Sequence, residues 1–301
     1  MNSQADWIKR FLQHLQHERR LSPRTVENYG RDLAQVLSYC KNRKLSDWTQ
    51  LDVHQVRALV AHLHRQGLHG RSIGRLLSAL RSLFRFLLRE GEVTHNPADG
   101  ISAPKAKRPL PKVLDVDQIS RLLDIKGNDP LKLRDRALME LMYSSGLRLA
   151  ELVSLDLNDL DRRDALVTVT GKGNKTRVLP VGKLALQAID AWLTARAGIA
   201  NIDEVALFTN RNGSRLSART IQARLREWGL KQGLDAKVHP HRLRHSFASH
   251  MLESSQDLRA IQELLGHADI GTTQIYTHLD FQHLAQVYDT AHPRAKRKRR
   301  P

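Results

Sequence analysis

The sequence is most informative at residues 239–247, which read His239-Pro240-His241-Arg242-Leu243-Arg244-His245-Ser246-Phe247. On a helix, His241 and Arg244 are three positions apart and therefore share one face. Leu243, Phe247 and Met251 then form the buried side of the same helix. We expect a helix that is anchored by its apolar side and that presents a histidine and an arginine together.

The histidines of this stretch raise the question of a metal site. Zinc sites in proteins generally use three or four ligands drawn from histidine, cysteine and carboxylate side chains. Cys40 is the only cysteine of the chain, and no His-Glu-x-x-His sequence or group of three carboxylates accompanies these histidines. We therefore expect no metal here.

Two more segments carry cations at positions from which a side chain can extend. Arg148 follows a glycine that ends a predicted helix, so it lies at the boundary of an element. Lys172 stands between two glycines on the loop that joins two predicted strands, residues 165–170 and 176–181. Taken singly, a surface arginine and a polar turn are the more common explanations.

A fourth segment supplies a histidine and a tyrosine, since Tyr276 follows His267 by nine residues. A lone tyrosine is more often a core aromatic residue, but the four segments together suit phosphoryl transfer. Arg148 and Arg244 can bind the nonbridging phosphate oxygens and stabilise the charge of the transition state. Tyr276 can attack phosphorus and form a covalent phosphodiester. Lys172 can protonate the leaving oxygen, and a histidine can help to deprotonate the phenol.

The composition points to a polyanionic partner. The chain has 49 Lys and Arg residues against 31 Asp and Glu, a formal net charge of +18 in 301 residues, and such a charge favours phosphate backbones. A basic ribosomal factor is the alternative. A single cysteine excludes a disulfide within the chain. The first twenty residues lack the apolar core of a signal peptide, and no run of about 18 apolar residues occurs. We expect a cytoplasmic protein.

The first hundred residues predict four helices. One carries Ile8 to Leu15 at helical spacing, a second begins at Ser22-Pro23, and a third follows Asp52 and stops near Gly67. The apolar face of the fourth runs from Ile73 to Leu87. Its other face holds five arginines that together could follow phosphates: Arg71, Arg75, Arg81, Arg85 and Arg89.

Residues 103–112 contain three prolines and four cations, which disfavours both helix and central strand. We interpret them as a basic linker between a helical DNA-binding domain at residues 1–102 and a mixed domain at residues 113–301. In the second domain a helix runs from Asp129-Pro130 to Gly146, and residues 257–265 and 281–288 are also expected to be helical. The predicted fold class is mostly α with one small β-sheet.

The four segments together resemble the tyrosine recombinase (phage integrase) family, and within it the Xer subfamily. The family pattern is an arginine, a lysine on a β-hairpin, His-x-x-Arg, a histidine or tryptophan, and a tyrosine. These match Arg148, Lys172, His241, Arg244, His267 and Tyr276. Glu151 matches an acidic residue that supports the active site. The resemblance covers nearly the whole chain.

The resemblance implies a C-shaped DNA clamp and a 3′-phosphotyrosine intermediate on Tyr276, with no metal, ATP or other cofactor. It further implies a heterotetramer with a XerD-like partner recombinase on a short, dif-like DNA site. Such a complex resolves chromosome dimers at cell division when an FtsK-like DNA translocase activates it. A terminal helix from Phe281 to Tyr288 either packs on its own domain or docks on the neighbouring subunit.

Three other functions remain open at this point. A catalytically silent DNA-binding regulator would not form a covalent adduct. A topoisomerase-like enzyme would relax supercoils as a monomer, without pairing two sites. An integrase of a mobile element would use the same chemistry on another target.

Overall fold

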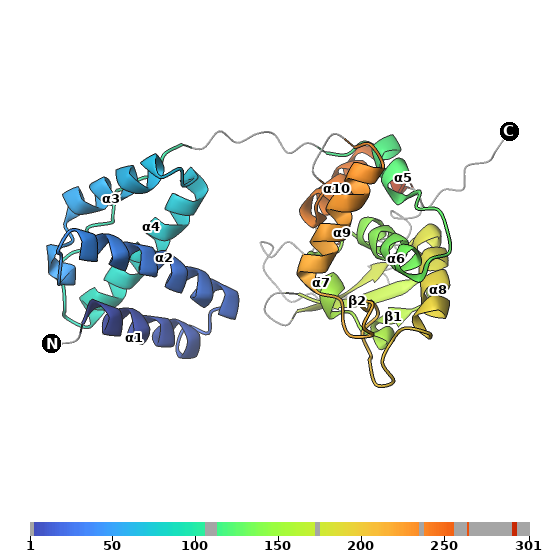
Figure 1. Ribbon diagram of the computed structural model, residues 1–301, viewed down its shortest axis with the longest axis horizontal. Helices are drawn as coiled ribbons and strands as arrows, with labels where there is room; N and C mark the ends of the chain where they lie inside the picture. The colour runs from blue at the N-terminus through green and yellow to red at the C-terminus, as the bar shows by residue number, and fades with distance from the viewer. Residues whose placement is uncertain are drawn as a thin grey trace. The chain divides into compact units, whose positions relative to one another are not determined.

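The computed structural model describes residues 3–105, 113–171, 175–234, 238–255, 264 and 291–293. The chain forms two compact units, Met1–Pro109 and Leu110–Pro301 (Figure 1). Most of the expected linker lies in residues 106–112, outside the described residues. In the part of the chain that is described, no helix is long and apolar enough to cross a bilayer.

The first unit contains the four expected helices, α1 (Gln4–His17), α2 (Pro23–Asn42), α3 (Val53–Arg65) and α4 (Gly70–Arg89), with a 3-10 turn at Trp48–Gln50. The predicted helix starts are confirmed. The Ser22 hydroxyl accepts a hydrogen bond from the Thr25 backbone N–H, and proline occupies the first turn of α2. Asp52 caps α3 in the same way through the N–H of Gln55.

The core of the first unit lies between α4 and the other three helices. The apolar face of α4 is buried from Ile73 to Leu87. Trp48 packs edge-on against Phe84, with ring centroids 5.9 Å apart. The buried apolar face predicted for this helix is therefore confirmed.

The arginines of α4 do not form one row of equivalent cations. Arg75 donates to both carboxylate oxygens of the buried Asp32, at 2.7 and 2.9 Å. Arg81 donates to the backbone carbonyls of Ala98 and Ile101, at 3.0 and 2.5 Å. These two side chains help to hold the unit together. The exposed members of the row are Arg71, Arg75, Arg85 and Arg89.

The second unit is mostly helical with one small sheet, as expected. Its elements are α5 (Val116–Leu123), α6 (Pro130–Ser144), α7 (Leu149–Ser154), a 3-10 turn (Leu157–Asp159), β1 (Leu160–Asp161), β2 (Leu166–Thr170), β3 (Thr176–Pro180), α8 (Lys183–Arg196), α9 (Ala218–Lys231) and α10 (Pro240–Ser255). The strands form an antiparallel sheet in the order β1-β2-β3. The predicted strands and hairpin agree with β2 and β3 to within one residue at each end.

Helix α6 is the central element of the second unit, and it packs on α8, α10 and α5 (Figure 1). Every residue from Ala137 to Ser144 is buried. Because this helix has no solvated face over its last two turns, its position is set by packing on several sides at once. The helix predicted from Asp129-Pro130 is confirmed, and the Asp129 carboxylate caps it through the N–H groups of Leu131 and Lys132.

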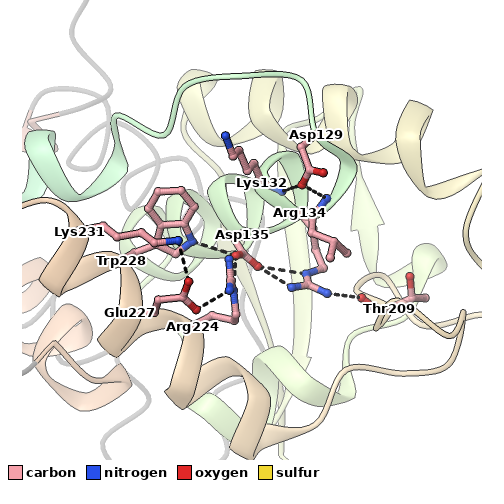
Figure 2. Close-up of polar contacts among 10 residues, drawn as sticks. Asp129, Lys132, Arg134, Asp135, Thr209, Arg224, Glu227, Trp228 and Lys231 are labelled. Carbon is pink, nitrogen blue, oxygen red and sulfur yellow. Dashed lines mark hydrogen bonds and ion pairs between the residues drawn. The ribbon is translucent and has the colours of Figure 1, made fainter.

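A buried carboxylate joins α6 to α9 (Figure 2). Asp135 accepts from Arg134 Nη2 at 2.7 Å, from Arg224 Nε at 2.6 Å and from Trp228 Nε1 at 2.8 Å. Arg134 also donates through Nη1 to the carbonyl of Thr209, at 3.2 Å. A buried carboxylate that is bonded on both oxygens stabilises one geometry, since any shift leaves a charge without a partner.

The chain returns to the core of the second unit at its last described residues. Ala291 and His292 are buried, and the His292 ring lies 5.1 Å from Tyr143 and 5.7 Å from Phe247, measured between ring centroids. The helices expected at residues 257–265 and 281–288 lie outside the described residues, except that Leu264 is helical and buried.

Candidate active site

The turn between α6 and α7 places Arg148. Gly146 in this turn has a φ of +59°, and an added Cβ would lie 2.4 Å from Cδ1 of Phe247 on α10. Only glycine combines that backbone angle with so close an approach. Arg148 is the N-cap residue of α7, and its side chain is 39% exposed. The prediction that it lies at an element boundary is confirmed.

Helix α10 supplies the second arginine. Leu243, Phe247 and Met251 form its buried side, as the sequence predicts, and His241 is exposed. Arg244 donates through Nη1 to the carbonyl of Gly146, at 2.5 Å. This bond ties α10 to the turn that carries Arg148, so the two arginines predicted to act together come from segments in direct contact.

The two guanidiniums influence each other electrostatically. Burial, and after it the nearby charge of Arg148, lowers the pKa of Arg244 to about 10. The group therefore stays protonated at neutral pH. The charge of Glu151 offsets part of this repulsion, and the positive charge that remains favours binding of a phosphate at the two arginines.

Glu151 fixes the position of Arg148 through hydrogen bonds. Its side chain is 2% exposed and accepts a bond from Arg148 Nη1 to Oε1 at 2.8 Å and one from the Arg148 backbone N–H to Oε2 at 2.8 Å. Arg177 donates to the same two oxygens, Nη1 to Oε1 at 2.8 Å and Nη2 to Oε2 at 2.9 Å. Burial alone would raise the pKa of Glu151, but the hydrogen bonds from Arg177 and Arg148 outweigh it and lower the pKa to about 2.

Arg177 is the residue that sequence reasoning missed. It lies on β3 opposite Val169 of β2, and its side chain is 8% exposed. The available signal is the alternation of the strand, in which Arg177 falls on the same buried face as Leu179. A charged residue on the inward side of a strand requires a buried partner, and Glu151 is that partner.

Three of the predicted site residues, Lys172, His267 and Tyr276, lie outside the described residues. The ends of the Lys172 loop are described. The Gly171 N–H donates to the carbonyl of Lys175 at 2.8 Å, and a Cβ built on Gly171 would lie 3.6 Å from Glu151 Oε1. The base of the hairpin therefore lies beside Glu151. In the described part of the chain, no group of three or more His, Cys, Asp or Glu side chains is placed to hold a metal.

The comparisons with known proteins define the class. Residues 112–283 match the phage integrase family, and residues 8–91 match the phage integrase N-terminal SAM-like domain. The chain belongs to the phage integrase family, and it is a site-specific tyrosine recombinase.

Individual relatives narrow the similarity to one group within this class, the Xer recombinases. The chain is 57% identical over 295 residues to the tyrosine recombinase XerC of Alcanivorax borkumensis, covering 97% of this chain and 95% of that one. It is 56% identical over 290 residues to the XerC of Salmonella typhi, covering 96% of each. The structure of the XerH site-specific recombinase bound to a palindromic difH substrate superposes with a TM-score of 0.74 at 22% identity, over 94% of each chain, which shows a shared fold.

These comparisons confirm the family, the Xer subfamily, the fold class and the enzymatic class expected from the sequence. The domain boundaries and the roles of the individual site residues stay predictions.

Proposed function

We infer that this recombinase cuts and rejoins DNA through a 3′-phosphotyrosine on Tyr276. We further infer that it works in the cytoplasm as a heterotetramer with a XerD-like recombinase on a dif-like site, where an FtsK-like translocase activates it. Its task is then to resolve chromosome and plasmid dimers at cell division. The observation that carries the chemistry is the pair Arg148 and Arg244, held from two segments by Glu151 and by the Gly146 carbonyl.

The pair accounts for the electrostatic part of catalysis. Arg148 and Arg244 are fixed before DNA arrives, because each donates to a partner within the protein. Preorganised donors stabilise the charge that develops on the nonbridging oxygens without a reorganisation cost. In many nucleases, divalent metal ions provide this stabilisation of the transition-state charge. The proposed reaction therefore needs neither metal nor nucleotide.

The remaining steps follow from the residue types. The phenol oxygen of Tyr276 attacks phosphorus while its proton passes to a histidine, His241 or His267. The bond from phosphorus to the 5′ oxygen breaks, and Lys172 gives a proton to that oxygen. The 5′-hydroxyl of the partner strand then attacks the phosphotyrosine and releases Tyr276. Since one phosphodiester is exchanged for another at each step, no external energy source is required.

The relatives support the cellular role, because the XerC proteins of several bacteria match along nearly the whole chain. The net charge of +18 supports a duplex DNA partner. A mobile-element integrase is the competing role for the same chemistry, and the identity to XerC proteins favours the housekeeping one.

The role is tested with two dif-like sites on one supercoiled plasmid. The chain, a XerD-like recombinase and an FtsK-like translocase should together excise the intervening DNA as a circle, and omission of any one should stop excision. Relaxation of the plasmid by the chain alone, with no excised circle in the complete mixture, would identify a topoisomerase instead. Binding with no strand exchange and no covalent adduct would identify a silent regulator.

A further inference from the structure

We propose that Arg177 is a positioning residue for DNA cleavage. Its guanidinium connects three features of the site: the Glu151 carboxylate that binds Arg148, the base of the 171–175 hairpin, and the carbonyl of Leu264. This inference rests on the proposed function and assigns to it a residue outside the set that the sequence predicts. Three observations carry it: the contacts of Arg177, the place of those contacts in the chain, and the use of every guanidinium nitrogen within the protein.

The first contact is with Glu151. Arg177 and Arg148 share this one carboxylate, and Arg177 supplies two of the four hydrogen bonds that it accepts from described residues. With Arg177 removed, the buried carboxylate keeps, among these bonds, the two from Arg148. The balance between burial and hydrogen bonding at Glu151 then shifts toward the neutral acid. A protonated Glu151 holds the Arg148 guanidinium less firmly, because a neutral acceptor makes a weaker bond than a charged one.

The second contact is with the hairpin. Arg177 pairs with Val169 across β2 and β3, one position inside the Thr170–Thr176 pair from which the loop extends. Gly171 lies beside the guanidinium, since a Cβ built there would be 3.6 Å from Arg177 Nη1. The residue that follows Gly171 in the sequence is Lys172, the proposed proton donor. Arg177 therefore fixes the strand end from which that lysine starts.

The third contact reaches a distant part of the chain. Arg177 Nε donates to the carbonyl of Leu264 at 3.3 Å, and Leu264 is buried in the core of the second unit. Leu264 precedes the predicted site residue His267 by three positions. One side chain thus joins the elements that carry Arg148 and Lys172 to the segment that leads to His267.

Arginine is required by this geometry. Nε, Nη1 and Nη2 each donate to a different acceptor oxygen within the protein, in the planar fork that lysine lacks. Because these nitrogens are engaged and the side chain is buried, the expected effect of replacement is on cleavage and not on DNA affinity.

The test compares Arg177→Lys and Arg177→Met with a matched control, Arg162→Met, in the full-length chain. Arg162 directly follows β1 in a turn of the same unit, and it forms an exposed ion pair with Asp190 at 3.3 Å. Each variant is incubated, beside an inactive partner recombinase, with a nicked duplex carrying a dif-like site. Single-turnover cleavage and Kd are measured at a temperature where unfolding curves show every variant folded.

We expect both Arg177 variants to cleave on the order of 100-fold more slowly, the scale of effect that a small misplacement of catalytic groups produces. Their Kd should stay within about threefold of the parent value, and Arg162→Met should match the parent in both respects. Parent-like cleavage by folded Arg177→Met, or equal losses in cleavage and affinity, would overturn the inference.

A second substrate separates positioning from a general loss of structure. When the leaving 5′ oxygen is replaced by sulfur, the thiolate leaves without a proton, since thiols have a pKa of about 8.5. The loss of cleavage rate caused by Arg177→Met, relative to the parent, should then be at least about tenfold smaller, and so should the loss caused by Lys172→Ala. An identical loss of Arg177→Met on both substrates would contradict the link to the hairpin. If the parent protein cleaves neither substrate, the proposed function itself fails, which is a distinct outcome.

Discussion

The pH dependence of stability at Glu151 follows directly from its contacts. In the folded protein the pKa of Glu151 is about 2, against an ordinary value of 4.5. A folded-state pKa below the unfolded one stabilises the fold above the unfolded pKa, and that stabilisation is lost as the pH falls toward 2. A difference of roughly 2.5 units corresponds to about 3 kcal/mol at neutral pH.

The free energy by which Glu151 stabilises the fold can be calculated at each pH between 7 and 3. By linkage, the stabilisation from this one group is still about 3 kcal/mol at pH 5 and about 1.4 kcal/mol at pH 3. Glu151→Gln keeps the size of the side chain but removes the ionisation. The free energy of unfolding of the parent should therefore exceed that of Glu151→Gln at pH 7, and the gap should narrow by about 2 kcal/mol at pH 3.

The assay must follow the second unit alone, because the chain has two compact units. Urea unfolding of the full chain, read by pulsed hydrogen exchange in peptides from α6 and α8, meets that need. Asp203→Asn, a change at an exposed carboxylate of the same unit, is the control for the loss of one acidic side chain. A difference in the free energy of unfolding between parent and Glu151→Gln that stays constant or widens from pH 7 to pH 3 would show that the ionised Glu151 does not stabilise the fold.

Four further predictions concern catalysis, DNA binding, folding and metal dependence. Arg148→Ala or Arg244→Ala should lower single-turnover cleavage by about 100-fold or more with a modest change in Kd. Equal losses in cleavage rate and in DNA affinity would show that these arginines do not act specifically in the transition state. Arg85→Ala should weaken binding to any duplex and flatten the salt dependence by roughly one unit of slope in a titration from low to high salt, whereas Arg81→Ala should lower the unfolding temperature instead. Asp135→Asn should destabilise the second unit by about 3–5 kcal/mol in urea, because it leaves the buried Arg134 without its charged partner. A loss below about 1 kcal/mol would show that the network is dispensable. Cleavage by the parent should persist in excess chelator without ATP, and a loss that Mg²⁺ restores would contradict the metal-free mechanism.

The local features of the fold were predictable because they depend on short-range chemistry. Ser22, Asp52 and Asp129 each precede a helix that their side chains cap, and the caps could be identified from two or three neighbouring residues. The buried side of α10 likewise follows from the spacing of Leu243 and Phe247.

The long-range contacts were not predictable in the same way. Arg177 and Glu151 are 26 positions apart, and Asp135 and Trp228 are 93 positions apart, so no local pattern joins them. The five arginines of α4 show the same limit, since their spacing places them on one side of the helix but cannot reveal that Arg81 donates to the carbonyls of Ala98 and Ile101. Partner choice for a long charged side chain is decided by tertiary packing.

The most direct test of the proposed chemistry is the chemical identity of the protein–DNA link. The chain is incubated with its partner recombinase and a nicked dif-like duplex, and the denaturant-resistant adduct is digested and sequenced by mass spectrometry. We predict one adduct, a 3′-phosphodiester on Tyr276, which is absent in Tyr276→Phe while DNA binding is retained. An adduct on another residue, or an undiminished adduct in Tyr276→Phe, would contradict it.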